Sequence, residues 1–348
     1  MSNPSLPPPD ATQTATLPGG PPPYNRIGAA YRPAPKRKIP GLIIDVHTHS
    51  HNPQLTREFI RAADDYSIGN IWTMAPLEDV DPLRQAFPGR FEFIAIPKWQ
   101  AMSSPKEFIS DWHTRLEGFY AKSSRLIKFH NAPGTQKRMG MTLDHPDIQG
   151  VMDHAYRLGY HFMSHVGDPQ AWFGEGKKYS PAEGHKSFVE QFPMLDRMLE
   201  KYPDRIHMGA HMGGLLEDLD TLQKRLDRYP HYIIDSSATK WMVRAIACQD
   251  VSRVRDFFIR NQDRILFGSD LVVGDKYNYD HYASRWWTHQ KLWETDYNGE
   301  SPIDDPDAPG GVPRLVGLNL PADVLEKLYR GNANRWLYGR VLKLAATA

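Results

Sequence analysis

The chain has 348 residues, enough for one large domain or two ordinary ones, and 40% of them are hydrophobic and 24% charged, as in globular proteins. Its 42 basic and 41 acidic residues leave a formal charge of +1, which gives no reason to expect a nucleic-acid partner or a membrane-surface partner. No apolar run approaches the roughly 18 residues that are needed to span a bilayer.

Residues 1–40 hold 11 of the 29 prolines, a composition that favours an extended, partly polyproline arm over helix or strand. The arm is either a ligand for a proline-binding module or a segment that lies along the barrel or a neighbouring subunit, and we favour the second. Its start lacks the features of a secretory signal, and the single cysteine, Cys248, excludes an internal disulfide and a cysteine-based zinc site. We therefore expect a cytoplasmic protein.

Short apolar segments rich in β-branched and aromatic residues follow from residue 41 onward, as is typical of strands buried on both faces. They are predicted at 42–46, 70–74, 91–96, 125–129, 160–164, 205–210, 232–236 and 264–268. Amphipathic helical segments lie between them, with apolar residues at three- and four-residue spacing. Eight such repeats predict an α/β fold, a (β/α)8 barrel over 41–348, and no glycine-rich phosphate loop supports the competing open sheet.

The active site of such a barrel lies at the carboxyl ends of its strands. Titratable residues stand at several of these ends in this chain: His47 and His49, Lys128 and His130, His165, His211, Asp235 and Asp270. Because side chains two apart on a strand point the same way, His47 and His49 are expected to face the barrel axis together. With His165 and Asp270 they form a set of three imidazoles and one carboxylate, which suits one zinc ion, or manganese, iron or cobalt.

His211 precedes Gly213 and Gly214 and is expected to act as general acid and base, or to orient the substrate carbonyl. The alternative is a buried, hydrogen-bonded core histidine. Asp270 is expected to ligate the metal and to take a proton from water, whereas its alternative role is a helix cap. The glycine pair either lets the backbone approach the substrate or simply makes a turn.

Four further side chains are candidates for substrate contact. Lys128 is either a carboxylated ligand that bridges two metals or an ammonium that binds an anionic group, and we favour the ammonium and a single metal. His130 is expected beside the substrate. Arg244 is either a carboxylate clamp or one half of an ion pair. Trp172 lies in an aromatic loop after the fifth strand that lines the pocket or packs a lid.

The segments "IIDVHTH", "LIKFH", "FMSHVGDP", "HMGAHMGG", "YIIDSSA" and "ILFGSDLVVG" resemble the amidohydrolase superfamily over residues 41 to about 340. Within it, the closest resemblance is to the amidohydrolase-related branch that contains aminocarboxymuconate-semialdehyde decarboxylase, lactonases and hydratases. The resemblance implies that His47, His49, His165 and Asp270 bind the metal and that His211 is the catalytic histidine. One decarboxylase group of this branch has glutamate where His47 stands, so that group is disfavoured.

The expected activity is hydrolysis of an amide, lactone or ester of a small molecule, in which a metal lowers the pKa of water and Asp270 or His211 takes the proton. The alternatives are non-oxidative decarboxylation or hydration of an aromatic or enoic acid, and a barrel that keeps a metal only for its fold. The segment after the eighth strand is longer than is typical of the family. Its helix carries Trp286, Trp287 and Trp293, which are expected in the barrel wall or in the interface of a homodimer or higher homo-oligomer, and we favour the interface.

Overall fold

The computed structural model describes residues 31–308 and 313–343, and it contains one parallel sheet of nine strands in the order β8-β7-β6-β5-β4-β3-β2-β1-β9. The strands are β1 (Ile43–His49), β2 (Ile68–Met74), β3 (Phe91–Ala95), β4 (Leu126–Asn131), β5 (His161–Val166), β6 (His207–Gly209), β7 (Tyr232–Asp235), β8 (Ile265–Leu266) and β9 (Leu271–Val272). A separate hairpin joins β10 (Asn298–Glu300) and β11 (Arg314–Val316).

The sheet closes on itself through the segment that follows β7. β8 pairs with β7, and β9, which follows β8 after four intervening residues, pairs in parallel with β1. Between them, Val46 N donates to Phe267 O at 2.9 Å and Asp270 N donates to His47 O at 2.7 Å. The last strand segment is therefore hydrogen-bonded to both of its neighbours, and the eight predicted strands form the predicted (β/α)8 barrel.

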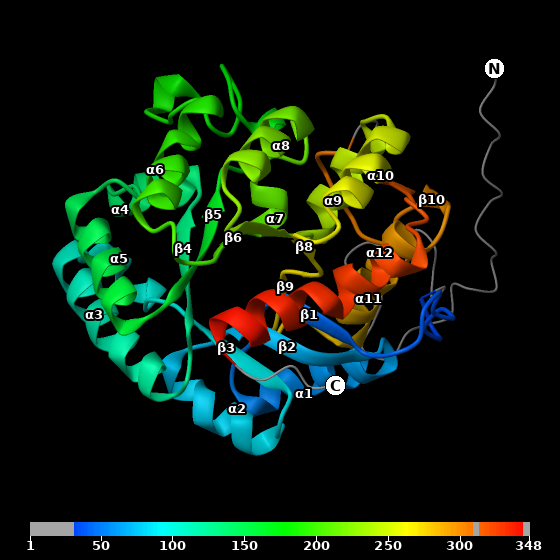
Figure 1. The fold of residues 1–348 in the computed structure, drawn as a ribbon, viewed down its shortest axis with the longest axis horizontal. Helices are drawn as coiled ribbons and strands as arrows, with labels where there is room; N and C mark the ends of the chain where they lie inside the picture. The colour runs from blue at the N-terminus through cyan, green and yellow to red at the C-terminus, as the bar shows by residue number, and fades with distance from the viewer. Residues whose placement is uncertain (1–30, 309–312, 344–348) are drawn as a thin grey trace.

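Helices surround the strands (Figure 1). They are α1 (Pro53–Asp65), α2 (Val80–Ala86), α3 (Pro105–Ala121), α4 (Pro133–Met139), α5 (Pro146–Leu158), α6 (Pro193–Lys201), α7 (Ala210–Gly213), α8 (Leu219–Arg228), α9 (Thr239–Ala247), α10 (Val251–Arg260), α11 (Tyr279–Glu294) and α12 (Ala322–Glu326). Short 3-10 turns lie at Leu77–Asp79, Trp99–Ser103, Gln170–Trp172, Pro181–Glu183 and Val189–Gln191, and α12 continues through π-helical stretches at Lys327–Gly331 and Ala333–Val341. Among the described residues, no helix is long and apolar enough to cross a membrane.

Two buried clusters form the core. The larger lies between the sheet and the surrounding helices, and the smaller fills the barrel interior, where Ile44, Leu126 and Ile233 from the strands meet Trp336 and Leu337 from the C-terminal helix. That helix crosses in front of the strands in Figure 1. Its apolar side chains thus fill the end of the barrel where the strands begin, which leaves the opposite end for polar groups.

The end of the proline-rich segment, residues 31–40, packs against the barrel, whereas residues 1–30 lie outside the described part. Tyr31 and Ile39 are buried, Arg37 Nε donates to Glu294 Oε1 at 2.7 Å, and the Lys38 backbone N–H donates to Glu294 Oε2 at 2.5 Å. The interpretation of an arm that lies along the barrel therefore describes residues 31–40.

The interface expected at the tryptophans of α11 is not there. Trp286, Trp287 and Trp293 are at most 4% exposed, and side chains of the same chain bury them. Trp286 packs against Phe59 of α1, with ring centroids 5.2 Å apart, and Trp293 packs against Phe258 of α10 at 5.0 Å. The barrel-wall interpretation is correct, and the favoured interface interpretation is wrong, because α11 fills the space between α1 and α10.

Candidate active site

The carboxyl ends of the strands bring the titratable residues together. His47 and His49 leave β1 on the same side, and their Nε2 atoms each lie 3.2 Å from Asp270 Oδ1. His47, His49 and Asp270 offer ligand atoms that all lie within 4.8 Å of one another, so this group could hold a metal ion. Three of the four ligands expected from the sequence therefore meet at one point.

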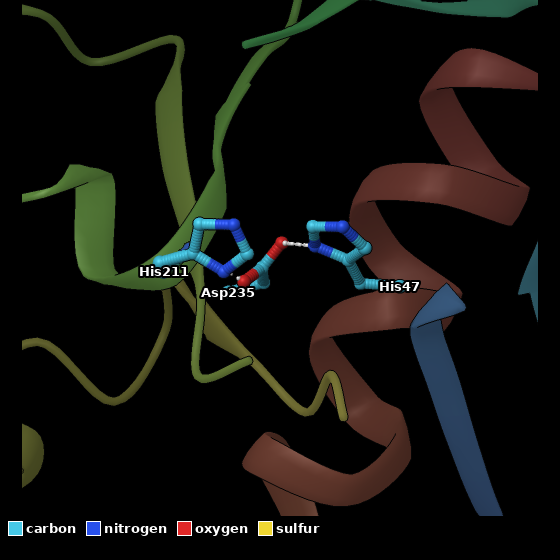
Figure 2. Close-up of side chains that lie close together, drawn as sticks. All are labelled: His47, His211 and Asp235. Carbon is cyan, nitrogen blue, oxygen red and sulfur yellow. Dashed lines mark hydrogen bonds and ion pairs between the residues drawn. The ribbon is translucent and has the colours of Figure 1, made fainter. Parts of the chain in front are cut away.

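Asp235, at the end of β7, orients His47. Figure 2 shows its carboxylate between the imidazole rings of His47 and His211. His47 Nδ1 lies 2.9 Å from Asp235 Oδ2, while the His211 backbone N–H donates to Asp235 Oδ1 at 2.9 Å. Since Nδ1–H of His47 donates to Asp235, we assign the lone pair of a neutral His47 to Nε2, the atom that faces Asp270.

The lone pair on His47 Nε2 bears on whether these residues fit a metal ion. A lone pair on His47 Nε2 would face a carboxylate oxygen at 3.2 Å, and this contact is favourable only with a proton or a cation between the two atoms. Burial lowers the pKa of His47, and so does Lys128, but Asp235 and Asp270 outweigh them and the net shift is upward. Burial raises the pKa of Asp270, yet His47 and His211 hold it well below its ordinary value. Two imidazoles and an ionised carboxylate suit a divalent transition-metal ion.

A second group of ligand atoms, in His47, His211 and Asp235, is also compact enough for a metal ion. However, Asp235 already accepts hydrogen bonds from His47, from the His211 backbone and from Ser237. Those donors occupy the carboxylate, which fits an orienting role as the partner of a metal-binding histidine. The group of His47, His49 and Asp270 is therefore the better candidate for a metal site.

His165 lies outside that group. Its Nε2 is 2.8 Å from Asp168 Oδ1, and its Nδ1 is 3.2 Å from His211 Nε2. Asp168 is held in turn by the hydroxyl of Tyr179. His165, the fourth expected ligand, therefore contacts Asp168 and His211 and not the other three. Asp168, three residues further along the loop, holds its ring.

His211 is buried and lies in the centre of this network. Ser237 donates its hydroxyl hydrogen to Asp235, so Ser237 Oγ, 2.8 Å from His211 Nδ1, accepts from that nitrogen. We therefore assign the proton of neutral His211 to Nδ1 and the lone pair to Nε2. Burial holds the pKa of His211 well below its ordinary value, with His165 and His47 adding to the shift. The imidazole is accordingly neutral near pH 7, with its lone pair on Nε2.

The backbone at these positions is unusual. His211, Met212, Ala238 and Asp270 have φ between 55° and 66°, a left-handed conformation that costs a residue with a side chain roughly 1–3 kcal/mol. Each follows a strand end. The loops therefore hold the two candidate catalytic side chains in a strained geometry that the surrounding hydrogen bonds enforce.

The glycine pair after His211 makes a close turn. Both residues have positive φ, and a Cβ on Gly214 would lie 2.2 Å from the Val166 carbonyl oxygen, while one on Gly213 would lie 2.5 Å from the Tyr232 hydroxyl. Contact with β5 and β7 therefore requires glycine at both positions, which supports the turn interpretation.

Lys128 is buried beside the group, with Nζ 3.4 Å from His47 Nε2. Burial lowers its pKa to about 8, although Asp235 and Asp270 oppose the shift. The ring of His130 packs against the ring of His165, with centroids 4.5 Å apart. His130 Nδ1 contacts Thr135 Oγ1 at 2.8 Å. Lys128 is thus near the metal group, whereas His130 contacts His165, which lies outside that group.

Arg244 and Trp172 each form a polar contact with an aspartate side chain. Arg244 Nη1 lies 2.7 and 2.6 Å from the two carboxylate oxygens of Asp305, and Trp172 Nε1 donates to Asp307 Oδ2 at 2.9 Å. Arg244 lines a small cavity of about 30 Å³, and His211 and Trp241 also line it. The pairing favours the ion-pair alternative for Arg244, although in the interior and not on the surface.

The sequence alone assigned no role to three residues of this network, which are Asp168, Asp235 and Ser237. Asp235 and Ser237 belong to the quoted segment "YIIDSS", and their position after a strand was the available signal. Asp168 follows "SHVG" in the sequence, and only the folded loop shows that its side chain contacts His165.

Comparison with known proteins identifies the family and the fold. The family model described as Amidohydrolase matches residues 83–339. A protein from Agrobacterium tumefaciens in its apo form has 12% sequence identity and a TM-score of 0.51, with 90% of this chain and 100% of that chain covered, so it shares the fold. No curated protein matches the chain.

Two further solved structures are similar over most of their length. A probable 2-pyrone-4,6-dicarboxylic acid hydrolase from Acinetobacter baumannii has 14% identity and a TM-score of 0.48, with 87% of this chain and 99% of that chain covered. An amidohydrolase from Burkholderia multivorans with bound zinc has 13% identity and a TM-score of 0.45, with 88% and 100% covered. The family model spans well over half of the sequence, and the chain therefore belongs to the amidohydrolase family of enzymes.

Proposed function

We propose that this enzyme is a metal-dependent hydrolase that adds water to the carbonyl carbon of a small amide, lactone or ester. The observation that supports the proposal is the convergence of His47, His49 and Asp270 at the barrel mouth, with neutral His211 nearby. A divalent ion, zinc or alternatively manganese, iron or cobalt, would polarise the carbonyl and make the attacking water more acidic.

The remaining roles belong to side chains of the protein. His47 and His49 would hold the ion through Nε2, with Asp235 fixing the ring of His47. His211 would accept the proton of the attacking water at Nε2, the atom that Ser237 leaves without hydrogen, and return it to the leaving group. His165, whose Nδ1 lies 3.2 Å from the same Nε2, would have to move aside or join the metal ligands for this step.

A second candidate is a non-oxidative decarboxylase or hydratase that acts on an aromatic or enoic acid. The buried cation of Lys128, 3.4 Å from His47, favours it, because an ammonium there could pair with a substrate carboxylate. In this reaction His211 would deliver a proton to the carbon that loses carbon dioxide.

Metal content per chain tests the proposal. We expect one equivalent in the wild-type protein and none in the double variant His47→Ala, His49→Ala. The matched control is His113→Ala, His154→Ala, which removes a pair of imidazoles on the outer helices α3 and α5 whose Nδ1 atoms are 2.9 Å apart. Retention of metal by the first variant, or its loss from the control, would contradict the assignment. Two equivalents in the wild type would instead indicate a carboxylated Lys128 that bridges two ions.

Substrate class requires a second assay. We expect the metal-loaded protein to hydrolyse simple lactones and aryl esters, and the metal-free protein to do so at least about 100-fold more slowly. Release of carbon dioxide from carboxylated aromatics without ester hydrolysis would establish the second candidate. The cytoplasmic location and the homo-oligomeric state are also proposals, and light scattering of the purified chain measures the oligomeric state directly.

A further inference from the structure

An open hollow of about 300 Å³ lies beside the metal group. Asp270 contributes to its wall together with Lys240, Tyr277, His281 and Arg285. Its size is at the lower end of the range for small-molecule sites. Since Asp270 is one of the proposed metal ligands, a molecule bound in this hollow would reach the reacting centre.

The hollow is lined by more positive than negative charge. Lys240 comes from α9 and Arg285 from α11, and Asp270 is the one carboxylate among the described residues of the lining. His281 adds no charge near neutral pH, because burial lowers its pKa to about 2. Burial also lowers the pKa of Arg285, to about 10, which leaves the guanidinium positively charged at neutral pH. A metal ion on Asp270 would make the hollow more positive still.

Arg285 is partly buried, as are Arg84, Arg125 and Arg264, which also form no ion pair among the described residues, whereas each fully buried arginine has a carboxylate partner. Arg115 pairs with Glu78 and Asp111, Arg225 with Asp196, and Arg244 with Asp305. Among the described residues, no aspartate or glutamate forms an ion pair with Arg285. Its one hydrogen bond to another described residue runs from Nη1 to the His281 carbonyl oxygen of its own helix, at 2.9 Å.

A guanidinium that is partly withdrawn from water and has no carboxylate partner in its own chain can be stabilised by the anion of a ligand. Burial of Arg285 within a substrate-sized hollow therefore favours a ligand with a planar anion that can accept two parallel hydrogen bonds. Tyr277 stacks on His281 with ring centroids 3.8 Å apart, which gives the wall beside the guanidinium a flat aromatic face. A carboxylate carried on a flat or unsaturated carbon skeleton matches both features.

We propose that Arg285 of α11 binds a carboxylate of the substrate in this hollow and thereby directs the rest of the molecule toward Asp270 and the metal group. Arg285 is a substrate-binding residue in this proposal, and the long segment after β9 is what supplies it. The substrate class is a small carboxylate-bearing lactone, amide, ester or unsaturated acid. The reaction part of this inference rests on the proposed function, whereas the binding part does not.

Isosteric pairs of probes test the binding part on the metal-loaded full chain. Benzoate and nitrobenzene have nearly the same shape, as do acetate and nitromethane, but only the carboxylates carry charge. Isothermal titration calorimetry at constant ionic strength should show that the wild type prefers each carboxylate over its nitro partner. In Arg285→Met, we expect carboxylate affinity to fall about tenfold or more and nitro-compound affinity to stay within about twofold.

Two further variants control for charge and folding. Arg285→Lys keeps a cation and should retain part of the carboxylate preference, which shows that the loss in Arg285→Met is not caused by a damaged fold. Arg253→Met removes an arginine from the outside of α10 and should bind every probe as the wild type does. Thermal unfolding of each variant verifies that the barrel is intact.

Each result decides the proposal. Equal affinity of the wild type for carboxylates and nitro compounds overturns it. An undiminished carboxylate preference in Arg285→Met also overturns it, since the metal alone would then capture the anion. Failure of the proposed function is separate from both: Arg285-dependent carboxylate binding without any hydrolysis or decarboxylation would leave the binding site in place and refute the reaction.

Discussion

Asp235 determines the orientation of two histidines at once, through His47 Nδ1 and the His211 backbone N–H. The carboxylate remains ionised: burial would raise its pKa, but His47 and His211 lower it far below its ordinary range. A change at this one residue should therefore affect the metal group without removing any ligand.

For Asp235→Asn, we expect metal affinity to fall about 10- to 100-fold, because an amide cannot accept all of the hydrogen bonds that the carboxylate accepts. Equilibrium competition with a chromophoric chelator measures the change. Asp227→Asn, which alters an exposed aspartate on α8, serves as the matched control. Unchanged affinity in Asp235→Asn would show that Asp235 does not orient a metal-binding histidine.

At His211, the proposed role is proton transfer, not metal binding. His211→Asn should lower kcat about 100- to 10,000-fold while metal content remains at the wild-type value. Activity and elemental analysis on the same preparation distinguish the two roles. Simultaneous loss of metal would instead assign His211 to the second ligand group, with His47 and Asp235.

At the scale of elements, α11 serves as both barrel wall and pocket wall. Its buried tryptophans face α1 and α10, while His281 and Arg285 line the hollow. Its last residue, Glu294, accepts hydrogen bonds from Arg37, from the Lys38 backbone and from the Tyr329 hydroxyl. This helix therefore joins the end of the N-terminal segment and the C-terminal helix to the barrel.

Removing the carboxylate from Glu294 should be costly. In Glu294→Ala, Arg37 and two further donors lose their partner in the interior, so we expect the free energy of unfolding to fall by about 3 kcal/mol. The control is Glu326→Ala, which breaks an ion pair with Arg330 at the surface and should cost less than about 1 kcal/mol. Urea unfolding monitored by tryptophan fluorescence gives both values, and similar losses in the two variants would contradict the argument.

The strands could be predicted from the sequence because each is a short apolar run that is buried on both faces, and the histidine pair of β1 could be placed because strand parity is strict. Asp168 and Arg285 could not be placed, since each belongs to a loop or helix whose position against the barrel depends on tertiary packing. The tryptophans of α11 show the same limit: an apolar helix face does not reveal whether its own chain or a second chain covers it.

At the scale of the whole molecule, buried neutral histidines should make the fold sensitive to acid. Burial lowers the pKa of His207 and His289 to about 3 and that of His161 to about 4, against about 6.5 in the unfolded chain. Between pH 6.5 and 4 the unfolded chain binds more protons than the folded chain. Stability therefore decreases as the pH falls through this window.

Each such histidine contributes a slope of about 1.4 kcal/mol per pH unit once the unfolded form is protonated. Urea unfolding at pH 7, 6 and 5 should show this decline. His289→Gln should show a shallower decline, because an amide can still bond to Thr239 but takes up no proton. Identical slopes in the variant and the wild type would show that His289 is protonated in the folded state.

The position of Cys248 offers a practical consequence. It is the only thiol of the chain, it is exposed, and it directly follows α9, the helix that carries Trp241 and Arg244 to the cavity beside His211. It lies four positions after Arg244, which corresponds to a helical rise of about 6 Å. A maleimide dye would attach there and nowhere else, without any engineered cysteine. Its emission would report, in real time and on the natural sequence, whether α9 shifts when a ligand enters.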